Sequence, residues 1–308
     1  MNKRKRSLLL SFGLMGLAFW MANASRPGPL ESCLVTCSNG NSLTTNHIRV
    51  LDLNMLHGFP RFEKLIDRVN LIAEEIIRLN PDIVCLQEVP WTVQTGSVAR
   101  ELAARTGMNY VYAPANGNRW AILFTEGEAI LSRYPISSAD FIELAPRPGY
   151  FEHRIALHAT LEVEEVEIQA ICTHLSHRES RINAAQVQSL VEILDSMANG
   201  PAILAGDFNA EDDTPQIEQL TRGWKDSYRI LHPLDAGLTC CIDAIKDPNA
   251  GSPDLRIDYL FVRDGANHEF QITRSDIIFN HPYPTQTGQL WASDHFGVWA
   301  DLEIVHGD

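Results

Sequence analysis

The chain has 308 residues, 45% of them hydrophobic, and carries 25 Lys and Arg against 39 Asp and Glu, a formal net charge of −14. This length and composition are typical of a large globular domain and exclude a disordered or collagen-like chain. The acidic balance opposes long-range attraction to nucleic acid or an anionic membrane. Any phosphate must therefore be bound locally, by a metal ion or by a few arginines.

The first 24 residues have the pattern of a signal peptide. A basic stretch at 3–6 precedes an apolar run at 8–21, and Ala22-Asn23-Ala24 has the small-x-small pattern of a cleavage site. The run is shorter than the roughly 20 residues of a spanning helix, so we expect cleavage after Ala24 and a secreted or cell-envelope protein. The alternative is a membrane anchor formed by residues 7–21. Cleavage would remove four basic residues and no acidic one, leaving 21 against 39, a net charge of −18.

Four of the six cysteines lie in polar stretches, where the oxidising environment of an exported protein allows disulfides. We expect Cys33 or Cys37, in a surface lead-in at 25–46, to bridge to Cys240 or Cys241, although the sequence leaves the pairing open. The remaining two cysteines lie in apolar, strand-like runs and are expected to be buried thiols: Cys85 and Cys172.

Residues 47–308 show alternating strand-like and helical patterns and no boundary between two domains. Apolar residues at helical spacing predict helices at 62–77, 98–105, 185–197 and 215–220. Strand-like runs are expected at 48–54, 82–88, 110–112, 121–124, 129–131, 155–163, 166–172 and 202–207. Glu164-Glu165 is a predicted hairpin turn between two of these strands.

Strand, helix, strand occurs twice in this order, and each of the four strands ends on a residue suited to metal binding or acid–base chemistry. These residues are Asn54 and Glu88 in the first unit, and His174 and Asp207 in the second. The pattern predicts one sandwich-like α/β domain whose strand ends converge on one face, where α/β sheets bind ligands.

The segment Ala202–Asn209 carries the strongest of these signals. Asp207 and Asn209 are two residues apart and would point to the same side of a strand. Gly206 allows a close approach to the backbone. The alternative is an ordinary turn after a strand, because Gly, Asp and Asn are all turn residues.

Oxygen donors dominate the predicted face. Glu88, supported by Asn54, is a suitable ligand set for Mg²⁺, with Mn²⁺ as a second choice. The face is too poor in closely spaced histidines for a catalytic zinc site, and no third ligand accompanies His174 and His177.

The other residues suit proton transfer. Asp207 can polarise a water molecule as a general base, and Asn209 can hold the attacked oxygen. Asp258 can orient an imidazole, and Asp294-His295 supplies a carboxylate and an imidazole side by side.

Taken together, six motifs in this order resemble the endonuclease/exonuclease/phosphatase superfamily, which includes pancreatic-type deoxyribonuclease, neutral sphingomyelinases and inositol-polyphosphate 5-phosphatases. The resemblance spans 48–305 and implies a four-layer α/β sandwich, with two packed mixed β-sheets flanked by helices. It also implies Mg²⁺-dependent, in-line hydrolysis of a phosphoester. The motifs are Leu53-Asn54, Leu86-Gln87-Glu88, Thr173-His174-Leu175, Gly206-Asp207-Phe208-Asn209, Arg256-Ile257-Asp258-Tyr259 and Ser293-Asp294-His295.

The resemblance implies a metal and phosphate group within the site. Glu88 would hold the metal, Asn54 would support the metal or contact phosphate, and Asp294 would lie near the metal. Arg154 falls where relatives often carry a phosphate-contacting arginine.

The resemblance also implies a proton-transfer group. Asp207 would orient or deprotonate the attacking water, while His295, paired with Asp258, would contact the phosphate and share acid–base work. His174 and Asn209 would stabilise the transition state. Glu126 or Glu128 would support His174.

Leu56 stands where abasic-site nucleases of the superfamily usually carry a polar residue, and those nucleases lack the Thr-His-Leu histidine. The chain is therefore closer to the other branches. We expect a monomeric, exported phosphodiesterase acting on a lipid headgroup or small phosphoester, with no stable protein partner. The alternatives are a deoxyribonuclease-like endonuclease and a catalytically silent protein that binds a phosphorylated ligand. Tyr283 and Trp291 are candidates for the substrate entrance.

Overall fold

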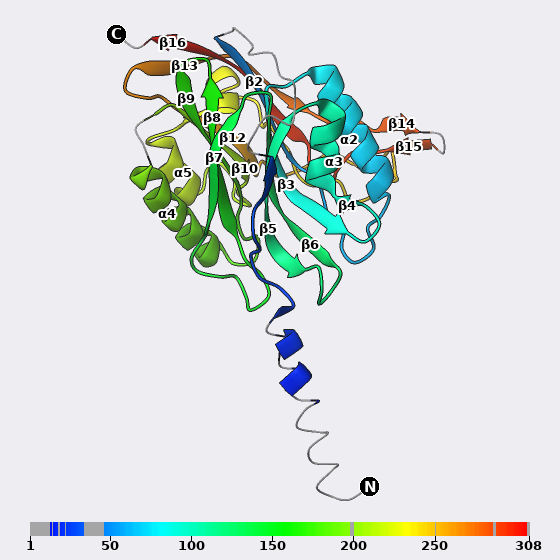
Figure 1. Cartoon of the computed structure of the whole chain (residues 1–308). Helices are drawn as coiled ribbons and strands as arrows, with labels where there is room; N and C mark the ends of the chain where they lie inside the picture. Colours follow the sequence, from blue (N-terminus) through cyan, green and yellow to red (C-terminus); the bar gives the residue numbers. More distant parts are fainter. Residues whose placement is uncertain are drawn as a thin grey trace, which may run out of the picture.

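Two β-sheets pack face to face in the computed structural model, and helices cover their outer faces (Figure 1). The structure describes residues 13, 15–17, 19–21, 23–33, 46–197, 200–249, 251–285 and 288–306. One sheet has eight strands and the other six. With the helices on either side, this is the four-layer α/β sandwich that the family resemblance implied.

The eight-stranded sheet is mixed, because β2 and β3 are parallel whereas β16 pairs antiparallel with β2 and β6 with β3. Its strand β1 lies within the predicted lead-in and pairs with β5. In spatial order its strands are β1 (Glu31–Cys33), β5 (Asn109–Asn118), β6 (Phe124–Ser132), β3 (Ile83–Thr92), β2 (His47–Asn54), β16 (Gly297–His306) and β13 (His268–Ile278), with β4 (Gly96–Ser97) beside β3.

The six-stranded sheet is also mixed, since β9 and β10 are parallel and β10 and β12 antiparallel. A separate two-stranded ribbon joins β14 (Tyr283–Thr285) to β15 (Gly288–Leu290). In spatial order the six strands are β11 (Lys225–Asp226), β12 (Asp258–Arg263), β10 (Ala202–Asp207), β9 (Val166–His174), β8 (Ile155–Val163) and β7 (Ile136–Glu143).

Each helix buries one apolar face against a sheet. Leu65, Val69, Ile72 and Ile76 recur at helical spacing and bury the inner face of the first helix. A left-handed Asn80 ends that helix immediately before a proline. On the eight-stranded sheet lie α2 (Leu65–Leu79) and α3 (Val98–Thr106); on the six-stranded sheet lie α4 (Ser180–Ser196) and α5 (Pro215–Thr221); α6 (Ser227–Leu231) contacts β12 and β13.

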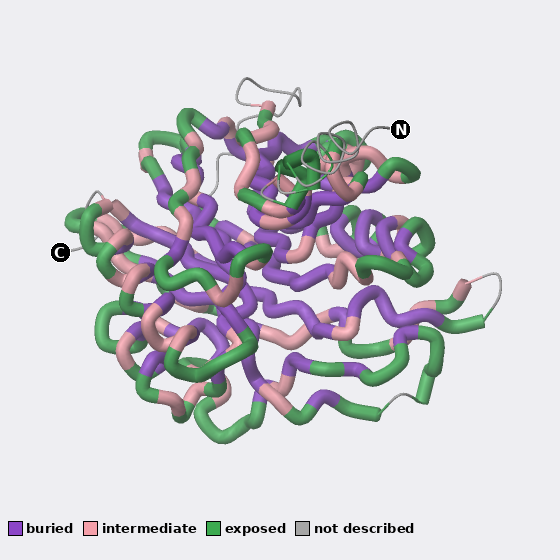
Figure 2. Tube along the Cα trace, turned by 90° about the horizontal axis from the view of Figure 1, so that it is seen from below, coloured by how far each residue is buried: buried purple, intermediate pink, exposed green. Residues whose placement is uncertain are grey.

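The largest apolar cluster fills the space between the two sheets, and two further clusters lie under the helices. Figure 2 shows the buried strands running through the middle of the molecule. Each fully buried aliphatic side chain stabilises the fold by about 1.5–3 kcal/mol. The central cluster includes Ile48, Val50, Ile83, Leu157, Ile168 and Leu260.

One predicted strand is wrong in its position. The run at 121–124 is mostly a turn, because the Asn118 side chain accepts hydrogen bonds from the backbone N–H groups of Trp120 and Ala121. This turn ends β5, and β6 begins only at Phe124. An asparagine that bonds backbone groups two and three residues ahead competes with strand pairing.

The predicted leader is only partly described. Residues 3–6 and 8–12, which are the basic stretch and the start of the apolar run, lie outside the described residues. Within the described part of the chain, no helix is long and apolar enough to cross a membrane. The described residues from 13 to 24 extend away from the domain beyond the tips of β5 and β6 (Figure 1).

Candidate active site

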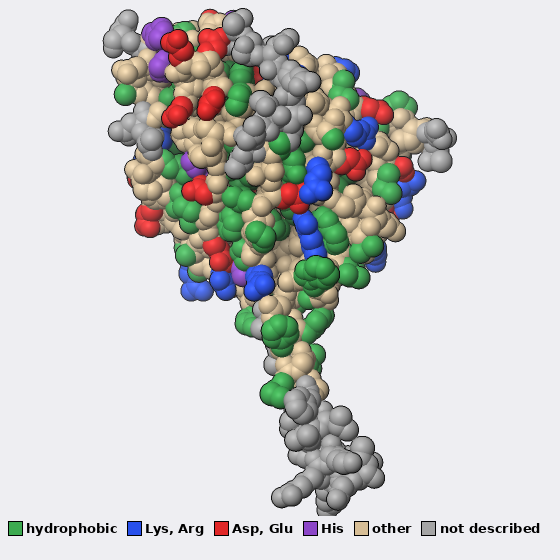
Figure 3. Space-filling view, in the orientation of Figure 1, with side chains coloured by type: hydrophobic (Ala, Val, Ile, Leu, Met, Phe, Trp, Pro, Cys, Tyr) green, Lys and Arg blue, Asp and Glu red, His purple; other side chains and the backbone are tan. Residues whose placement is uncertain are grey.

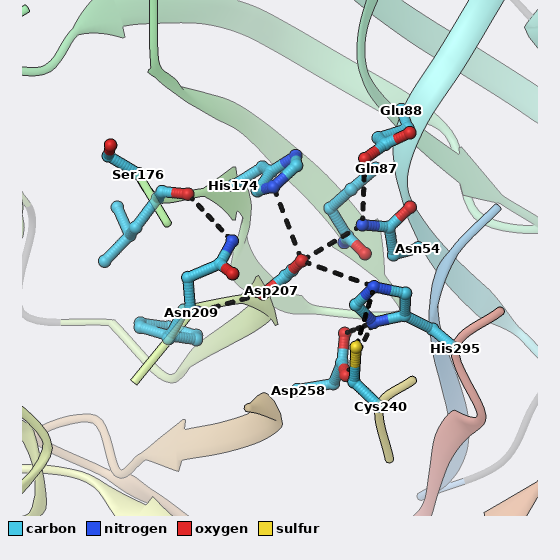
Figure 4. Close-up of polar contacts among 12 residues, drawn as sticks. Asn54, Gln87, Glu88, His174, Ser176, Asp207, Asn209, Cys240, Asp258 and His295 are labelled. Carbon is cyan, nitrogen blue, oxygen red and sulfur yellow. Dashed lines mark hydrogen bonds and ion pairs between the residues drawn. The ribbon is translucent and has the colours of Figure 1, made fainter. Parts of the chain in front are cut away.

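Polar side chains from both sheets meet where the strands that carry them end (Figure 4). Asp207, the last residue of β10, is the register partner of His174 on β9 and of Asp258 on β12. From the eight-stranded sheet, Asn54 ends β2 and Glu88 lies on the neighbouring β3. The structure thus brings together the strand-end residues that the sequence singled out.

The turn after β10 fixes the position of Asp207. Gly206 has a φ of 153°, and a Cβ there would overlap the carbonyl oxygen of Thr173 on β9. This is the close backbone approach expected from the glycine. Asn209 has a φ of 48°, and its backbone N–H donates to Asp207 Oδ1 at 2.9 Å. The turn expected as the alternative for this segment is therefore present, and its hydrogen bond positions the Asp207 carboxylate.

Asp207 lies at the centre of the cluster. Its Oδ2 accepts a hydrogen bond from Asn54 Nδ2 at 3.0 Å and lies 3.3 Å from His174 Nε2 and 3.8 Å from His295 Nε2. Burial, followed by the charge of Asp258, raises the pKa of Asp207 to about 7. A carboxyl group with a pKa near neutrality is well matched to general-base catalysis.

His295 and Asp258 form a buried pair. His295 Nδ1 lies 3.1 and 3.0 Å from the two carboxylate oxygens of Asp258. Burial lowers the pKa of His295, but the charge and hydrogen bond of Asp258 outweigh it and hold that pKa well above the ordinary value. The pair orients the ring and leaves Nε2 directed toward Asp207, as the sequence predicted for an acid–base histidine.

His174 is held neutral. Burial and then the charge of Arg154 lower its pKa well below the ordinary value. Its Nδ1 is buried and has no hydrogen-bond partner among the described residues. The expectation that Glu126 or Glu128 supports this ring is therefore wrong. Glu126 instead accepts a hydrogen bond from Asn116.

Glu88 reaches the site through a bulge in β3. Its φ is 55°, and the register with β6 shifts between Leu86 and Val89. The bulge directs its carboxylate toward Asn54, whose Nδ2 lies 3.4 Å from Glu88 Oε1. Burial raises the pKa of Glu88, but the contacts with His57 and the charges of His295 and Arg154 together outweigh it, so the net pKa is lowered and the carboxylate is charged.

These contacts provide a set of oxygen ligands for a cation. The carboxylates of Glu88 and Asp207 both lie within hydrogen-bonding distance of Asn54 Nδ2, and carboxylate oxygens suit Mg²⁺. One atom each of Asp207, Asp258 and His295 also lie within 4.8 Å of one another. Within this group, Asp258 is already hydrogen-bonded to His295 Nδ1.

Asp294 lies at the edge of this arrangement. It lines a neighbouring cavity of about 240 Å³ with Arg68 and is not among the residues that line the catalytic cavity. Ser293 links Asp294 to Asn54 in the catalytic cluster. Its Oγ donates to the Asn54 carbonyl at 2.6 Å and lies 3.3 Å from Asp294 Oδ1.

Arg154, just before β8, faces the catalytic cavity from the other side. The residue is buried, its Nη2 donates to Glu152 Oε1 at 3.1 Å, and its Nε has no partner among the described residues. A buried guanidinium with an unpaired donor is suited to binding a phosphate oxygen. The position therefore fits the phosphate contact that the resemblance implied.

The catalytic cavity is large and is lined by both polar and apolar side chains. Its volume is about 1010 Å³. The polar lining includes the cluster around Asp207. The aromatic and apolar lining residues are Trp20, Phe59, Ile122, Phe124, Tyr150 and Phe151. A cavity of this form fits a phosphoester that carries an apolar group.

Hydrophobic side chains gather at this end of the domain, where the N-terminal segment leaves it (Figure 3). Tyr150 is 68% exposed and packs edge to face against Phe151. The expected entrance residues Tyr283 and Trp291 do not line the cavity. Trp291 is buried and stacks on Phe296.

The cysteines pair differently from the expectation. Cys240 and Cys241 form a disulfide with each other, so neither bridges to Cys33 or Cys37. Cys33 is itself disulfide-bonded. The remaining two cysteines are buried free thiols, as predicted: Cys85 and Cys172.

Two features of the site were missed by the sequence analysis. His57 donates its backbone N–H to Glu88 Oε2 at 3.0 Å, and its ring Nε2 lies 3.4 Å from the same oxygen. The Cys240–Cys241 disulfide lines the cavity, with Cys240 Sγ 3.4 Å from His295 Nε2. Both depend on loop conformations. The only sequence signals were a histidine three residues after Asn54 and a Cys-Cys pair.

The chain is similar to several known proteins. It is 25% identical over 319 residues to an uncharacterised protein of Caenorhabditis elegans, covering 88% of this chain and 96% of that protein. It is 30% identical over 179 residues to Protein angel of Drosophila melanogaster, covering 53% of this chain and 49% of that protein. The chain thus spans about half the length of Protein angel.

The fold is shared with solved structures. An endonuclease/exonuclease/phosphatase family protein from Leptotrichia buccalis superimposes with a TM-score of 0.63 at 20% identity, covering 83% of this chain and 99% of that one. The model of the endonuclease/exonuclease/phosphatase family matches residues 53–295. Members of this family are generally hydrolases that act on phosphoesters and depend on divalent metals. The chain belongs to the endonuclease/exonuclease/phosphatase family.

Proposed function

We propose that the protein is an exported, Mg²⁺-dependent phosphodiesterase that hydrolyses a lipid or another small phosphoester with an apolar group. The observation that carries this proposal is the form of the catalytic cavity, which is polar at Asp207 and aromatic at Tyr150 and Phe151. The strongly acidic chain, at −14 overall, disfavours a long nucleic acid as the preferred substrate.

The contacts support a division of roles. Asp207 orients the attacking water and takes its proton, and Arg154, which lines the cavity, binds a phosphate oxygen. His295, oriented by Asp258, contacts the phosphate and gives a proton to the leaving oxygen. Neutral His174 donates from Nε2 toward the charge that develops in the transition state.

The metal and the remaining amide complete this arrangement. Glu88 would hold Mg²⁺, with Asn54 Nδ2 3.4 Å from Glu88 Oε1 and 3.0 Å from Asp207 Oδ2. When bound, the ion supplies charge neutralisation at the phosphoryl group. Asn209 is anchored through Nδ2 to the Leu175 carbonyl at 3.0 Å, which positions its amide next to Asp207.

Export is part of the proposal. The leader extends from the cavity mouth, where Trp20 Nε1 donates to the Ala121 carbonyl at 2.9 Å. Cleavage after Ala24 would remove Trp20 and widen the mouth. N-terminal sequencing of envelope and medium fractions should find Ser25 first. Intact Met1 in a membrane pellet would instead support the anchor.

A substrate panel with Mg²⁺ tests the activity. Sphingomyelin vesicles, plasmid DNA, inositol phosphates and bis-p-nitrophenyl phosphate should be compared at equal enzyme concentration. We expect hydrolysis of bis-p-nitrophenyl phosphate and of the lipid. Fastest cleavage of DNA would favour the endonuclease alternative, and no hydrolysis of any substrate would favour a silent binding protein.

Variants of two exposed aromatic residues that line the cavity, Tyr150 and Phe151, test whether the substrate carries an apolar group. Tyr150→Ser and Phe151→Ser should raise KM for vesicle lipid by about tenfold, because each removes apolar surface that the substrate would cover. Hydrolysis of bis-p-nitrophenyl phosphate should change little. Leu234→Ser is the matched control, because Leu234 is 98% exposed and does not line the cavity. Equal effects on both substrates would contradict the lipid assignment.

A further inference from the structure

A disulfide lies directly against the acid–base histidine. Cys240 Sγ is 3.4 Å from His295 Nε2, and the backbones of the two residues form a β-bridge. The backbone N–H of Phe296 also donates to the Thr239 carbonyl at 2.7 Å. Cys240 is buried, whereas Cys241 is exposed, and both line the catalytic cavity. A small thiol that enters the cavity therefore reaches this disulfide.

Cys240 Sγ and His295 Nε2 have the spacing of two ligands of one metal ion, and the second sulfur is bonded to the first. One ligand atom from each of Cys240, Cys241 and His295 lies within 4.8 Å of the others. A tetrahedral Zn²⁺ with bonds of about 2.3 Å to sulfur and 2.0 Å to nitrogen holds such atoms about 3.6 Å apart. The distance of 3.4 Å from Cys240 Sγ to His295 Nε2 is close to this value.

The ring of His295 is oriented by a carboxylate on one nitrogen, as is common for histidines that bind a metal through the other nitrogen. Its Nδ1 is hydrogen-bonded to the Asp258 carboxylate, which leaves Nε2 directed toward the sulfur. A carboxylate on the far ring nitrogen is the common outer partner of a zinc-bound histidine, because it fixes the ring and increases the basicity of the ligand nitrogen.

We propose that, once the Cys240–Cys241 disulfide is reduced, the two thiolates and His295 Nε2 bind a thiophilic divalent cation of the Zn²⁺ or Cd²⁺ type. The bound ion occupies Nε2 and so withdraws His295 from hydrolysis. This second consequence rests on the proposed function, whereas the binding itself does not.

The redox step balances with an external thiol as the reductant. Two thiol molecules give two electrons and two protons to the protein disulfide, which yields two protein thiols and one external disulfide. The cation then displaces the two thiol protons and the proton on His295 Nε2, because metal ligands must be deprotonated.

The site is chemically distinct from the Mg²⁺ ligands. Thiolate and imidazole favour soft or borderline cations, whereas Glu88 and Asp207 offer hard oxygen atoms. The two cysteines that are already free before reduction are poor competitors. Burial raises the pKa of Cys172 well above the ordinary value, and Cys85 is buried beside it between the sheets.

The test uses Cd²⁺ as the probe on the whole chain. Protein is reduced with a phosphine, freed of reductant under anaerobic conditions and titrated with Cd²⁺ in excess Mg²⁺. We expect a thiolate-to-cadmium ultraviolet band that saturates at one ion per reduced chain and is absent from the oxidised chain. Hydrolysis of bis-p-nitrophenyl phosphate should fall in step with the band in the reduced chain alone.

Variants identify the ligands. Cys240→Ser/Cys241→Ser should lose the band, and His295→Ala should bind Cd²⁺ about 100-fold more weakly, because loss of a ligand costs at least as much as loss of its outer partner. Cys33→Ser/Cys37→Ser is the matched control and should bind as the wild type does. A melting curve for each variant establishes that it is folded.

Three results would overturn the proposal: no band in the reduced wild type, an equal band in the Cys240→Ser/Cys241→Ser chain, or unchanged Cd²⁺ affinity in His295→Ala. The last variant leaves every cysteine in place, so it remains informative if the serine chain does not fold. If no phosphoester is hydrolysed, the proposed function fails, while the cadmium band still decides the metal site.

Discussion

Asp258, on β12 of the six-stranded sheet, forms a hydrogen bond with His295, in the loop before β16. His295 Nδ1 lies 3.0 Å from Asp258 Oδ2. Both residues are buried, and Asp258 is also the register partner of Asp207. The carboxylate that orients the imidazole therefore lies next to the residue that is proposed to activate water. This relationship predicts that the three residues act as one unit.

The first prediction concerns additivity. His295→Ala and Asp258→Asn should each lower kcat on a phosphodiester, the former by about 10²–10⁴ as expected for loss of an acid–base group. The double variant should lose much less than the product of the two single losses, because residues that act as a unit are non-additive. Kinetics with bis-p-nitrophenyl phosphate measure this. Multiplicative losses would show that Asp258 acts independently of His295.

The second prediction concerns the metal. EDTA should abolish activity and Mg²⁺ should restore it. Glu88→Gln should raise the Mg²⁺ concentration for half-maximal activity by about tenfold or more, because it removes a charged ligand. Glu179→Gln is the control, since the Glu179 side chain is 60% exposed and does not line the cavity. Zinc rescue without magnesium rescue, or indifference to EDTA, would contradict an oxygen-donor site.

The third prediction concerns Arg154. Arg154→Lys keeps the charge but loses the planar donor fork, so kcat/KM should fall by about 10- to 100-fold, the value of a charged hydrogen bond. Arg147→Lys provides the control, because Arg147 is paired with Glu143 at a surface position outside the cavity. Similar kinetics in the two variants would remove Arg154 from phosphate binding.

The strand ends were predictable from sequence because their signal is local. An apolar run that stops at a polar residue identifies both the strand and its functional end, as at Asn54 and Asp207. Several strands were missed, among them the antiparallel strands β7 and β13. In β7, Ser137, Ser138 and Asp140 break the apolar pattern, and in β13 a register shift between Ile272 and Arg274 interrupts the alternation.

The parts of the site that sequence could not predict depend on contacts between distant segments. The bulge that directs Glu88 is a property of its pairing with β6. The choice of Cys241 rather than Cys33 as the partner of Cys240 is decided by the conformation of a loop. The cavity rim is likewise formed by loops far apart in sequence, and only the fold brings Phe59 close to Phe124, with their rings stacked at 4.6 Å.

The fourth prediction concerns a buried carboxyl group, Glu128. Burial, followed by the charge of Glu126, raises the pKa of Glu128 well above the ordinary value. The native state therefore holds a proton that the unfolded state releases, so this group lowers stability as pH rises from the unfolded pKa to the folded pKa. Glu128→Gln removes this effect.

The melting temperature of Glu128→Gln should accordingly exceed that of the wild type by a margin that grows between pH 6 and pH 9. Glu165→Gln is the control, because Glu165 is exposed in the turn between β8 and β9. Thermal scans across this pH range make the comparison. A margin that does not change with pH would show that Glu128 is ionised in the native protein.

The most direct test of the account is the activity of Asp207→Asn. The substitution keeps the shape of a side chain that ends a strand and removes the carboxylate on which water activation depends. With saturating Mg²⁺ and bis-p-nitrophenyl phosphate, kcat should fall by about 10²–10⁴ while the melting temperature stays near that of the wild type. Wild-type turnover in this variant would contradict the assignment of the catalytic site.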